Sequence, residues 1–225
     1  MPDDYRQPEG GYRFSQDSVL LARFVPPLLE GRAADLGAGC GVVGLEALAQ
    51  GRLGGLGTLF LIEAGRDFRD SLRENAARAL ASRPDGPEIV AIEADWRFLG
   101  PSALDGPLDF LVVNPPYHKG GSSGQARAGR LQARHETMGG LGDLFGAAGR
   151  LLRPLSPMAL SFPRERLRDL VGAAAAAGFA ASRFHMPPRR GLGLVLAEFR
   201  SPPPAWQRAP GQPGQRGHSQ YRTVD

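Results

Sequence analysis

The chain has 225 residues, 42% of them hydrophobic, and a formal net charge of +4. That length and apolar content suffice for one globular domain with a substantial core. No run approaches the roughly eighteen apolar residues of a membrane span, and the polar start MPDDYRQPEGG is unlike a signal peptide. A single cysteine, Cys40, excludes an intrachain disulfide and a cysteine metal cluster. We therefore expect a cytoplasmic protein with no membrane segment and no metal.

Arginine supplies nearly all of the 27 basic residues, since Lys119 is the only lysine. One explanation is a genome-wide codon bias. The other is a preference for phosphate groups and stacked bases, which a planar guanidinium suits better than an ammonium group. The mild positive charge permits nucleic-acid binding but does not establish it.

In chain order, the predicted elements begin with a short extended piece over residues 12–15. Asp17 is the expected N-cap of a first helix, Ser18 to Val25, which ends at Pro26-Pro27. Strands are expected at 33–36, 58–62, 88–93, 108–113, 157–162, 180–185 and 192–199. Further helices are expected at 42–50, 66–81, 139–152 and 164–177, with a loop rich in Gly, Ser, Gln and Arg at 118–136.

Strands that alternate with helices predict an α/β fold, here a Rossmann-like, seven-stranded, mostly parallel sheet with helices on both faces. A short turn near 187–191 joins the last two strands, which predicts an antiparallel pair at one edge. The carboxyl ends of the first four strands should then meet at the edge where such folds bind ligands.

A glycine-rich turn follows the first predicted strand and opens a helix. Gly39 to Gly44, GCGVVG, formally matches the dinucleotide fingerprint GxGxxG, which is weak evidence alone. Glu63 strengthens it, because it ends the next strand, 19 residues after Gly44. An acidic group at that position accepts hydrogen bonds from ribose hydroxyls. The pattern predicts a nucleoside cofactor.

Two features favour S-adenosylmethionine over NAD. Asp35 stands just before the first glycine, where it would repel a pyrophosphate but tolerate a sulfonium or an amino group. Asp95 follows the third strand and can meet an adenine amine, with Trp96 near the ring. The alternatives are that Asp95 caps the next turn and that Glu63 caps the next helix. Cys40 is interpreted as a small residue in a tight loop rather than a nucleophile.

The fourth strand ends in Asn114-Pro115-Pro116-Tyr117. Methyl transfer to a planar amine requires its nitrogen to become pyramidal, which two acceptors on its N–H bonds favour. The Asn114 side-chain oxygen and the Pro115 carbonyl can be those acceptors, and the prolines fix their direction. Tyr117 can stack on the substrate ring. The alternative is a plain Pro-Pro turn with an incidental tyrosine.

Together these residues resemble the class I S-adenosylmethionine-dependent methyltransferases with an Asn-Pro-Pro-Tyr/Phe motif, and most of all the bacterial tRNA1(Val) adenine-N6-methyltransferases. The likeness covers residues 5–200 and rests on QPEGGYRFSQDSVLLARFV, DLGAGCGVVGLEAL, and NPPYHKGG followed by Ala133-Arg134-His135-Glu136. It implies methylation of an adenine exocyclic amine in RNA, at N6 of the tRNA adenine 3′ of the anticodon.

The resemblance also implies roles for individual residues. The catalytic residues would be Asn114, Pro115, Pro116 and Tyr117. Cofactor contacts would come from Asp17, Asp35, Gly37, Ala38, Gly39, Gly41, Glu63, Ala64, Asp95, Trp96 and Asn114. Substrate contacts would come from Tyr117, His118, Lys119, Arg134 and His135. For Asp17 the alternative is helix capping, and for Arg134 and His135 it is a solvated flank of the next helix.

The implied organisation has three parts. Residues 1–30 would cap the cofactor site, and residues 31–200 would form the methyltransferase catalytic domain. Residues 201–225 are rich in Pro, Gly and Gln and are expected to be flexible. This tail departs from the family, whose chains often end in an ordered basic or aromatic segment.

Several other functions share some of these motifs. A guanine-N2-methyltransferase of ribosomal RNA also carries Asn-Pro-Pro-aromatic-His, but usually with a second, upstream copy of the domain. A protein-glutamine N5-methyltransferase normally has a helical domain ahead of the cofactor loop, and a DNA adenine methyltransferase has a target-recognition domain. A nonenzymatic RNA-binding module and a dinucleotide dehydrogenase remain alternatives, which an S-adenosylmethionine binding assay would separate from the enzyme.

Overall fold

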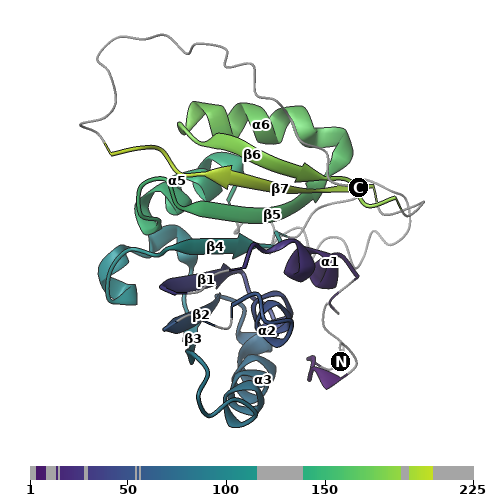
Figure 1. The fold of residues 1–225 in the computed structure, drawn as a ribbon, viewed down its shortest axis with the longest axis vertical. Helices are drawn as coiled ribbons and strands as arrows, with labels where there is room; N and C mark the ends of the chain where they lie inside the picture. The colour runs from purple at the N-terminus through teal and green to yellow at the C-terminus, as the bar shows by residue number, and fades with distance from the viewer. Residues whose placement is uncertain are drawn as a thin grey trace.

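The computed structural model in Figure 1 describes residues 4–8, 14, 16–27, 30–53, 55, 57–115, 139–188 and 193–204. These form one seven-stranded sheet in the order β3-β2-β1-β4-β5-β7-β6. The strands are β1 Arg32–Leu36, β2 Thr58–Glu63, β3 Glu88–Glu93, β4 Phe110–Val113, β5 Pro157–Pro163, β6 Ala180–His185 and β7 Leu194–Arg200. The predicted α/β fold is therefore confirmed.

The α-helices are α1 Gln16–Phe24, α2 Val42–Ala49, α3 Arg69–Ala81, α5 Leu141–Leu151 and α6 Leu167–Ala176. Short 3-10 helices are η2 Arg66–Phe68, η3 Trp96–Phe98, η4 Pro101–Leu104 and η5 Arg164–Arg166. In the described part of the chain, no helix has the length and apolar character needed to cross a bilayer.

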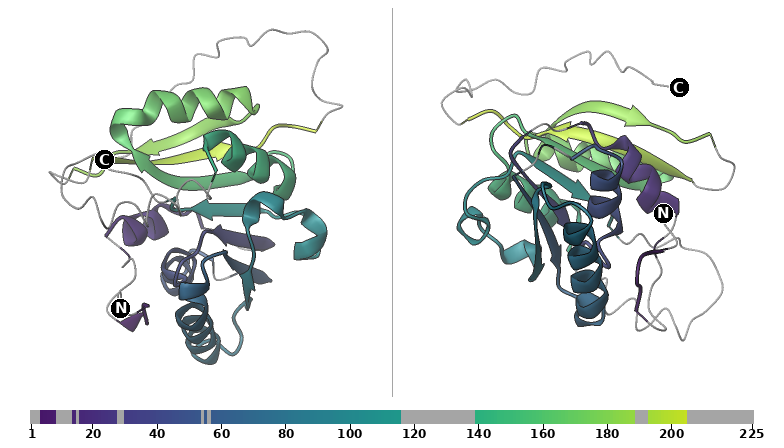
Figure 2. Two further views of the ribbon diagram at one scale, coloured as in Figure 1. Left: turned by 180° about the vertical axis from the view of Figure 1, so that it is seen from behind. Right: turned by 60° about the horizontal axis from the view of Figure 1, so that its bottom comes forward.

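Helices cover both faces of the sheet (Figure 2). Successive strand residues point to opposite faces, so each strand contributes to two separate cores. On one face, α1, α2 and α3 pack on strand residues such as Ala33, Leu59 and Val112. On the other, α5 and α6 pack on the alternate strand residues, including Leu36 and Leu111.

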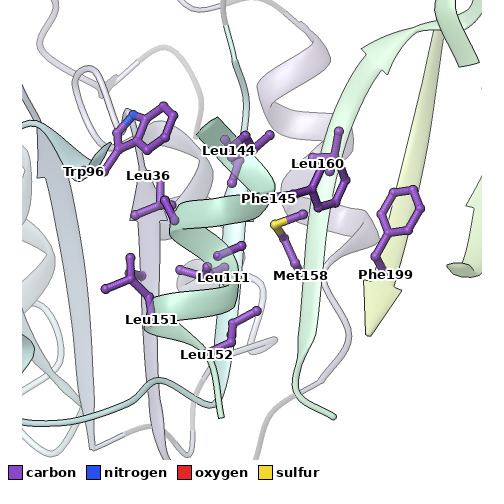
Figure 3. Packing of buried hydrophobic residues seen from close by; sticks show 14 of the residues in the cluster. Leu36, Trp96, Leu111, Leu144, Phe145, Leu151, Leu152, Met158, Leu160 and Phe199 are labelled. Carbon is purple, nitrogen blue, oxygen red and sulfur yellow. The ribbon is translucent and has the colours of Figure 1, made fainter. Parts of the chain in front are cut away.

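Figure 3 shows the second core, where α5 lies against β4 and β5. Phe145 of α5 is fully buried, and its ring meets Phe199 of β7 edge to face at 5.4 Å between centroids. Burying side chains of this size stabilises the fold by about 1.5–3 kcal/mol each. The packing holds β4 in place, and with it Asn114 and Pro115 directly after the strand.

Parallel pairing brings four strand ends to one edge, which we call the carboxyl edge. Leu36 of β1 is in register with Ile62 of β2 and with Val113 of β4, and Glu63 is in register with Glu93 of β3. β5 continues the parallel set beside β4, whereas β7 runs antiparallel between β5 and β6. The glycine turn, Glu63, Asp95 and Asn114 therefore all emerge at the carboxyl edge.

The structure corrects the predicted start of the first helix. α1 begins at Gln16, so Asp17 lies in its first turn and is not its N-cap. The apolar pattern that guided the prediction starts at Ser18, but a helix also includes the polar turn before its buried face. Of the extended piece predicted at 12–15, only Phe14 is among the described residues, and it is in no strand.

Other boundaries differ by small amounts. The predicted helix at 66–81 is split into η2 and α3, and the one at 164–177 into η5 and α6. Leu108 does not belong to β4; it forms an isolated bridge with Leu152 instead. The predicted loop at 118–136 and most of the predicted tail, from residue 205 onward, lie outside the described residues.

Candidate functional site

The turn between β1 and α2, residues 37–41, is called the glycine loop below. Gly37, Gly39 and Gly41 have φ values of +69°, +57° and +87°, which side chains with a Cβ rarely adopt. The N–H groups of Gly37 and Ala38 donate to the Ile62 carbonyl at 2.8 and 3.0 Å. The loop is thus tied to the end of β2.

Glu63 links the loops that follow β1 and β2. Its carboxylate accepts the Gly39 N–H at 2.8 Å and the Gly65 N–H at 2.6 Å. The N-cap residue of the helical segment that begins at Arg66 is Gly65, not Glu63. A carboxylate can accept about four hydrogen bonds, so these two contacts are compatible with the predicted ribose contact.

Asp35 is a buried carboxylate at the end of β1, only 1% exposed. Its Oδ2 accepts the Gly44 N–H at 2.9 Å, and its Oδ1 is buried without a hydrogen-bond partner among the described residues. Burial raises the pKa of Asp35 to about 7, with the hydrogen bond from Gly44 opposing the rise and the charge of Glu63 adding to it. A nearby cation would relieve this burial penalty.

Asp17 of α1, like Asp35, has a buried carboxylate oxygen, its Oδ1, without a hydrogen-bond partner among the described residues. The next residue, Ser18, contacts Asn114, so Asp17 stands on α1 beside a residue that reaches the carboxyl edge. Two unpartnered carboxylate oxygens suit the cationic methionine end of S-adenosylmethionine and disfavour a pyrophosphate. The residues present therefore fit the predicted cofactor.

Asp95 has a structural role that the sequence left as an alternative. Its side chain accepts the Arg97 N–H at 3.0 Å and so caps η3. It also forms an ion pair with the Arg97 guanidinium, and these hydrogen bonds hold the pKa of Asp95 below its usual range. The capping interpretation is confirmed, and contact with an adenine amine stays a prediction.

Trp96, which follows Asp95, and Ala64, which follows Glu63, differ in burial. Trp96 is 7% exposed and belongs to the same buried cluster as Leu36 and Leu144 (Figure 3). Ala64, between Glu63 and Gly65, is exposed. Trp96 thus supports the carboxyl edge from the core side, and its contact with a cofactor ring is still a prediction.

Asn114 follows β4 and is held by two serines that the sequence did not single out. Its Nδ2 donates to Ser18 Oγ of α1 at 3.0 Å. Its Oδ1 accepts from Ser161 Oγ of β5 at 2.5 Å. The one signal for Ser161 in the sequence is a hydroxyl inside the apolar strand PMALSFP. Pro115 is half-buried beside Asn114.

The remaining predicted catalytic and substrate-binding residues lie outside the described residues. These are Pro116, Tyr117, His118, Lys119, Arg134 and His135.

Asn75 of α3 is a further residue that sequence reasoning missed. Its Nδ2 donates to the Cys40 carbonyl in the glycine loop and to the Arg6 carbonyl, each at 2.9 Å, and its Oδ1 accepts the Arg6 N–H. Cys40 itself is buried, and burial raises the pKa of its thiol to about 11. The thiol is therefore neutral at physiological pH, as expected for a packing residue.

Metal ligands were not expected from the sequence. In the described ranges, no group of three or more His, Cys, Asp or Glu side chains is placed to hold a metal ion.

Known proteins resemble this chain in sequence and in fold. The family model described as methyltransferase small domain matches residues 12–136. A tRNA1(Val) (adenine(37)-N6)-methyltransferase of Porphyromonas gingivalis is 30% identical over 214 residues, 88% of this chain and 78% of that protein. The ribosomal RNA large subunit methyltransferase G of Pseudomonas paraeruginosa is 38% identical over 116 residues, 51% of this chain and 28% of that protein.

Solved structures extend the fold comparison. NSun6 from Pyrococcus horikoshii matches with a TM-score of 0.60 at 16% identity, over 84% of this chain and 53% of that one. At that identity the match establishes the shared sheet architecture and nothing about substrate.

Proposed function

This chain belongs to the methyltransferase small domain family, and on that premise we propose that it methylates N6 of adenine in RNA, at the tRNA adenine 3′ of the anticodon. It is a methyltransferase with S-adenosylmethionine as its cofactor. The substrate is the proposed part. It is supported by the relative from Porphyromonas gingivalis, which is named for this reaction and aligns with 88% of the chain.

The observation that carries the proposal is the position of Asn114 relative to Asp35. Asp35 is in register with Val112 on the adjacent strand, and Asn114 follows Val113 at the same edge. A carboxylate suited to a cationic cofactor and an amide suited to a neutral amine thus lie on neighbouring strands. That pairing supports methyl transfer between them.

The residues of the chain would act by position rather than by proton transfer. The cofactor supplies an electrophilic methyl group when bound. Asp17, Asp35 and Glu63 would hold its amino and ribose groups. Asn114 Oδ1 and the Pro115 carbonyl would each accept one N–H of the target amine, which favours a pyramidal nitrogen.

The RNA contacts of this proposal rest on sequence alone. We assign ring stacking to Tyr117, worth roughly 1–3 kcal/mol for a base. We assign RNA contacts to His118, Lys119, Arg134 and His135. A base in a stacked loop would have to be turned out to reach Asn114. We also propose that the protein works in the cytoplasm, where its RNA substrate is found.

We also propose that the chain has three parts with different roles. α1, within residues 1–30, contacts α2 and β5, which supports its assignment as a segment over the cofactor site. Residues 31–200 would carry the catalytic domain, and residues 201–225 a flexible tail.

A second candidate is methylation of guanine N2 in ribosomal RNA. It is favoured by the 38% identity with the ribosomal RNA large subunit methyltransferase G over 116 residues. A planar exocyclic amine is common to both substrates, so Asn114 would act in the same way.

Nucleoside mass spectrometry separates the two candidates. Purified protein and isotope-labelled S-adenosylmethionine are incubated with tRNA or with large-subunit rRNA, both unmodified transcripts. We expect labelled N6-methyladenosine from tRNA, lost when the adenine 3′ of the anticodon is replaced. Labelled N2-methylguanosine from rRNA, with none from tRNA, would overturn the first candidate in favour of the second.

A further inference from the structure

Both polar atoms of the Asn114 amide form hydrogen bonds with serines that are distant in sequence. Ser18, 96 residues before it, accepts from Nδ2 at 3.0 Å. Ser161, 47 residues after it, donates to Oδ1 at 2.5 Å. Both serines are buried, at 4% and 1% exposure. They contact the amide from two separate elements, α1 and β5.

This arrangement matters because an asparagine amide can be rotated by half a turn with little change in shape. One orientation offers an acceptor at a given point and the other a donor. Hydrogen bonds to both amide atoms fix the plane of the amide, and in the orientation observed Nδ2 donates to Ser18 while Oδ1 accepts from Ser161. An Oδ1 atom has two lone pairs, so the bond from Ser161 leaves one for a further N–H donor.

We propose that Ser18 and Ser161 are positioning residues for methyl transfer, which hold the Asn114 amide so that the second lone pair of Oδ1 accepts from the target amine. This inference rests on the proposed function, because it assumes a planar amine as the methyl acceptor. Because both serines are buried and bond the Asn114 amide, they act through Asn114. Without them the amide can turn, and the acceptor geometry is then populated only part of the time.

The two serines should differ in their effects. Ser161→Ala removes the donor to Oδ1 and leaves the acceptor atom unrestrained. Ser18→Ala leaves an N–H of Asn114 without its partner but keeps the bond that orients Oδ1. We therefore expect the larger kinetic effect from Ser161→Ala.

The test compares single-turnover methyl transfer to tRNA with the Kd for S-adenosylmethionine, in the full chain. We expect Ser161→Ala to slow transfer roughly 10- to 100-fold, as small misplacements of reacting groups do. Its Kd for the cofactor should stay within about twofold of wild type. Ser161→Thr keeps a hydroxyl and should restore much of the rate.

A matched control is Ser201→Ala. Ser201 is 3% exposed and its hydroxyl bonds the Ser156 N–H at 3.0 Å and the Arg153 carbonyl at 2.6 Å, at the amino end of β5. This variant removes an equally buried hydroxyl but should turn over normally. The double variant Ser18→Ala/Ser161→Ala should lose less than the product of the two single losses, since both act on one amide.

Two failures are distinguishable. If wild type methylates tRNA and Ser161→Ala turns over like Ser201→Ala, the positioning role is wrong and the proposed function stands. The same holds if the loss in rate follows a loss in cofactor affinity. If wild type methylates no adenine in RNA, the proposed function fails, and the role of the serines fails with it.

Discussion

The Gly44 N–H donates a 2.9 Å hydrogen bond to the buried carboxylate of Asp35, whose other oxygen has no partner among the described residues. The first turn of α2 therefore holds Asp35 at the end of β1 through Oδ2, and Oδ1 can still accept a hydrogen bond. This relationship connects the stability of the fold to cofactor binding, because the same carboxylate serves both.

Cofactor affinity should increase as pH rises toward 7. Burial raises the pKa of Asp35 to about 7, so the group is largely neutral below that pH and must ionise to meet a cation. The gain in affinity should approach roughly tenfold per pH unit well below the pKa and level off above it. Calorimetric titration with S-adenosylmethionine from pH 5.5 to 8.5 measures this. Asp35→Asn should bind weakly with little pH dependence, and a sloping profile in that variant would contradict the assignment.

The unliganded protein should show the opposite trend in stability. The folded-state pKa of Asp35 lies above its unfolded value of about 3.9. The stability from this group is complete below the unfolded pKa and is lost as pH rises through about 7. Asp35→Asn keeps an oxygen for Gly44 without the buried charge, so its Tm should exceed that of wild type at pH 8. The gap should narrow toward pH 5; a pH-independent gap would show that Asp35 does not titrate in this range.

Gly44→Ala should destabilise the protein and weaken cofactor binding. A Cβ at this position would lie 3.0 Å from Leu61 Cδ2 and 3.3 Å from the Asp35 side chain. Crowding of this kind typically costs about 1–3 kcal/mol, more than the helix propensity gained. The matched control is Gly172→Ala in α6, where an added Cβ would meet no atom within 4 Å beyond its chain neighbours and its own helix backbone. Thermal unfolding should show this variant as stable as wild type or more so.

Glu63→Gln should weaken cofactor binding by roughly tenfold or more, about the loss expected when charge-assisted hydrogen bonds disappear. The Gly39 and Gly65 N–H groups bond different oxygens of Glu63, and glutamine replaces one of these oxygens with an NH2 group that cannot accept. Equilibrium titration with the cofactor measures the loss. Glu88→Gln, an exposed change at the amino end of β3, should leave the Kd unaltered. Equal values for the two variants would argue against the role of Glu63.

Asn75→Ala should lower stability and loosen the glycine loop. The change removes the donor to the buried Cys40 carbonyl and both contacts with Arg6. An unsatisfied buried group typically costs about 1–3 kcal/mol. Denaturant unfolding should register this, with Ser82→Ala, an exposed hydroxyl on the Ala79 carbonyl, as the neutral control. If the variant is as stable as wild type and amide exchange is faster only in residues 4–8, Asn75 holds that segment but does not support the glycine loop.

Asn114→Ala should reduce methyl transfer by at least roughly 10²–10³-fold while cofactor binding survives. The substitution removes the amide acceptor but leaves Asp35 and Glu63 in place. Single-turnover rates and cofactor titration on the same preparation measure the two effects. A variant with near-normal turnover would rule out Asn114 as an acceptor for the target amine.

Local chemistry was enough to predict most of the architecture. Alternation of apolar strands with amphipathic helices led to the α/β fold, because those periodicities depend on neighbouring residues alone. Glycines that tolerate positive φ marked the turn after β1, and prolines marked the end of β4. Since parallel strands end at one edge, the positions of Asp35, Glu63 and Asn114 along the chain also predicted that they meet.

The way in which those residues are held depends on contacts between distant segments of the chain. Ser18 and Ser161 reach Asn114 from 96 and 47 residues away, and Asn75 reaches Cys40 across 35 residues. These contacts form because of the way α1, α3 and β5 pack. The sequence pattern around a single buried serine or asparagine does not indicate which distant residue it will contact. The pKa of Asp35 likewise follows from complete burial, which its neighbours in sequence do not determine. The order of residues along the chain was thus enough to predict which groups line the carboxyl edge. Their orientation and charge follow from packing, because both depend on contacts between distant segments.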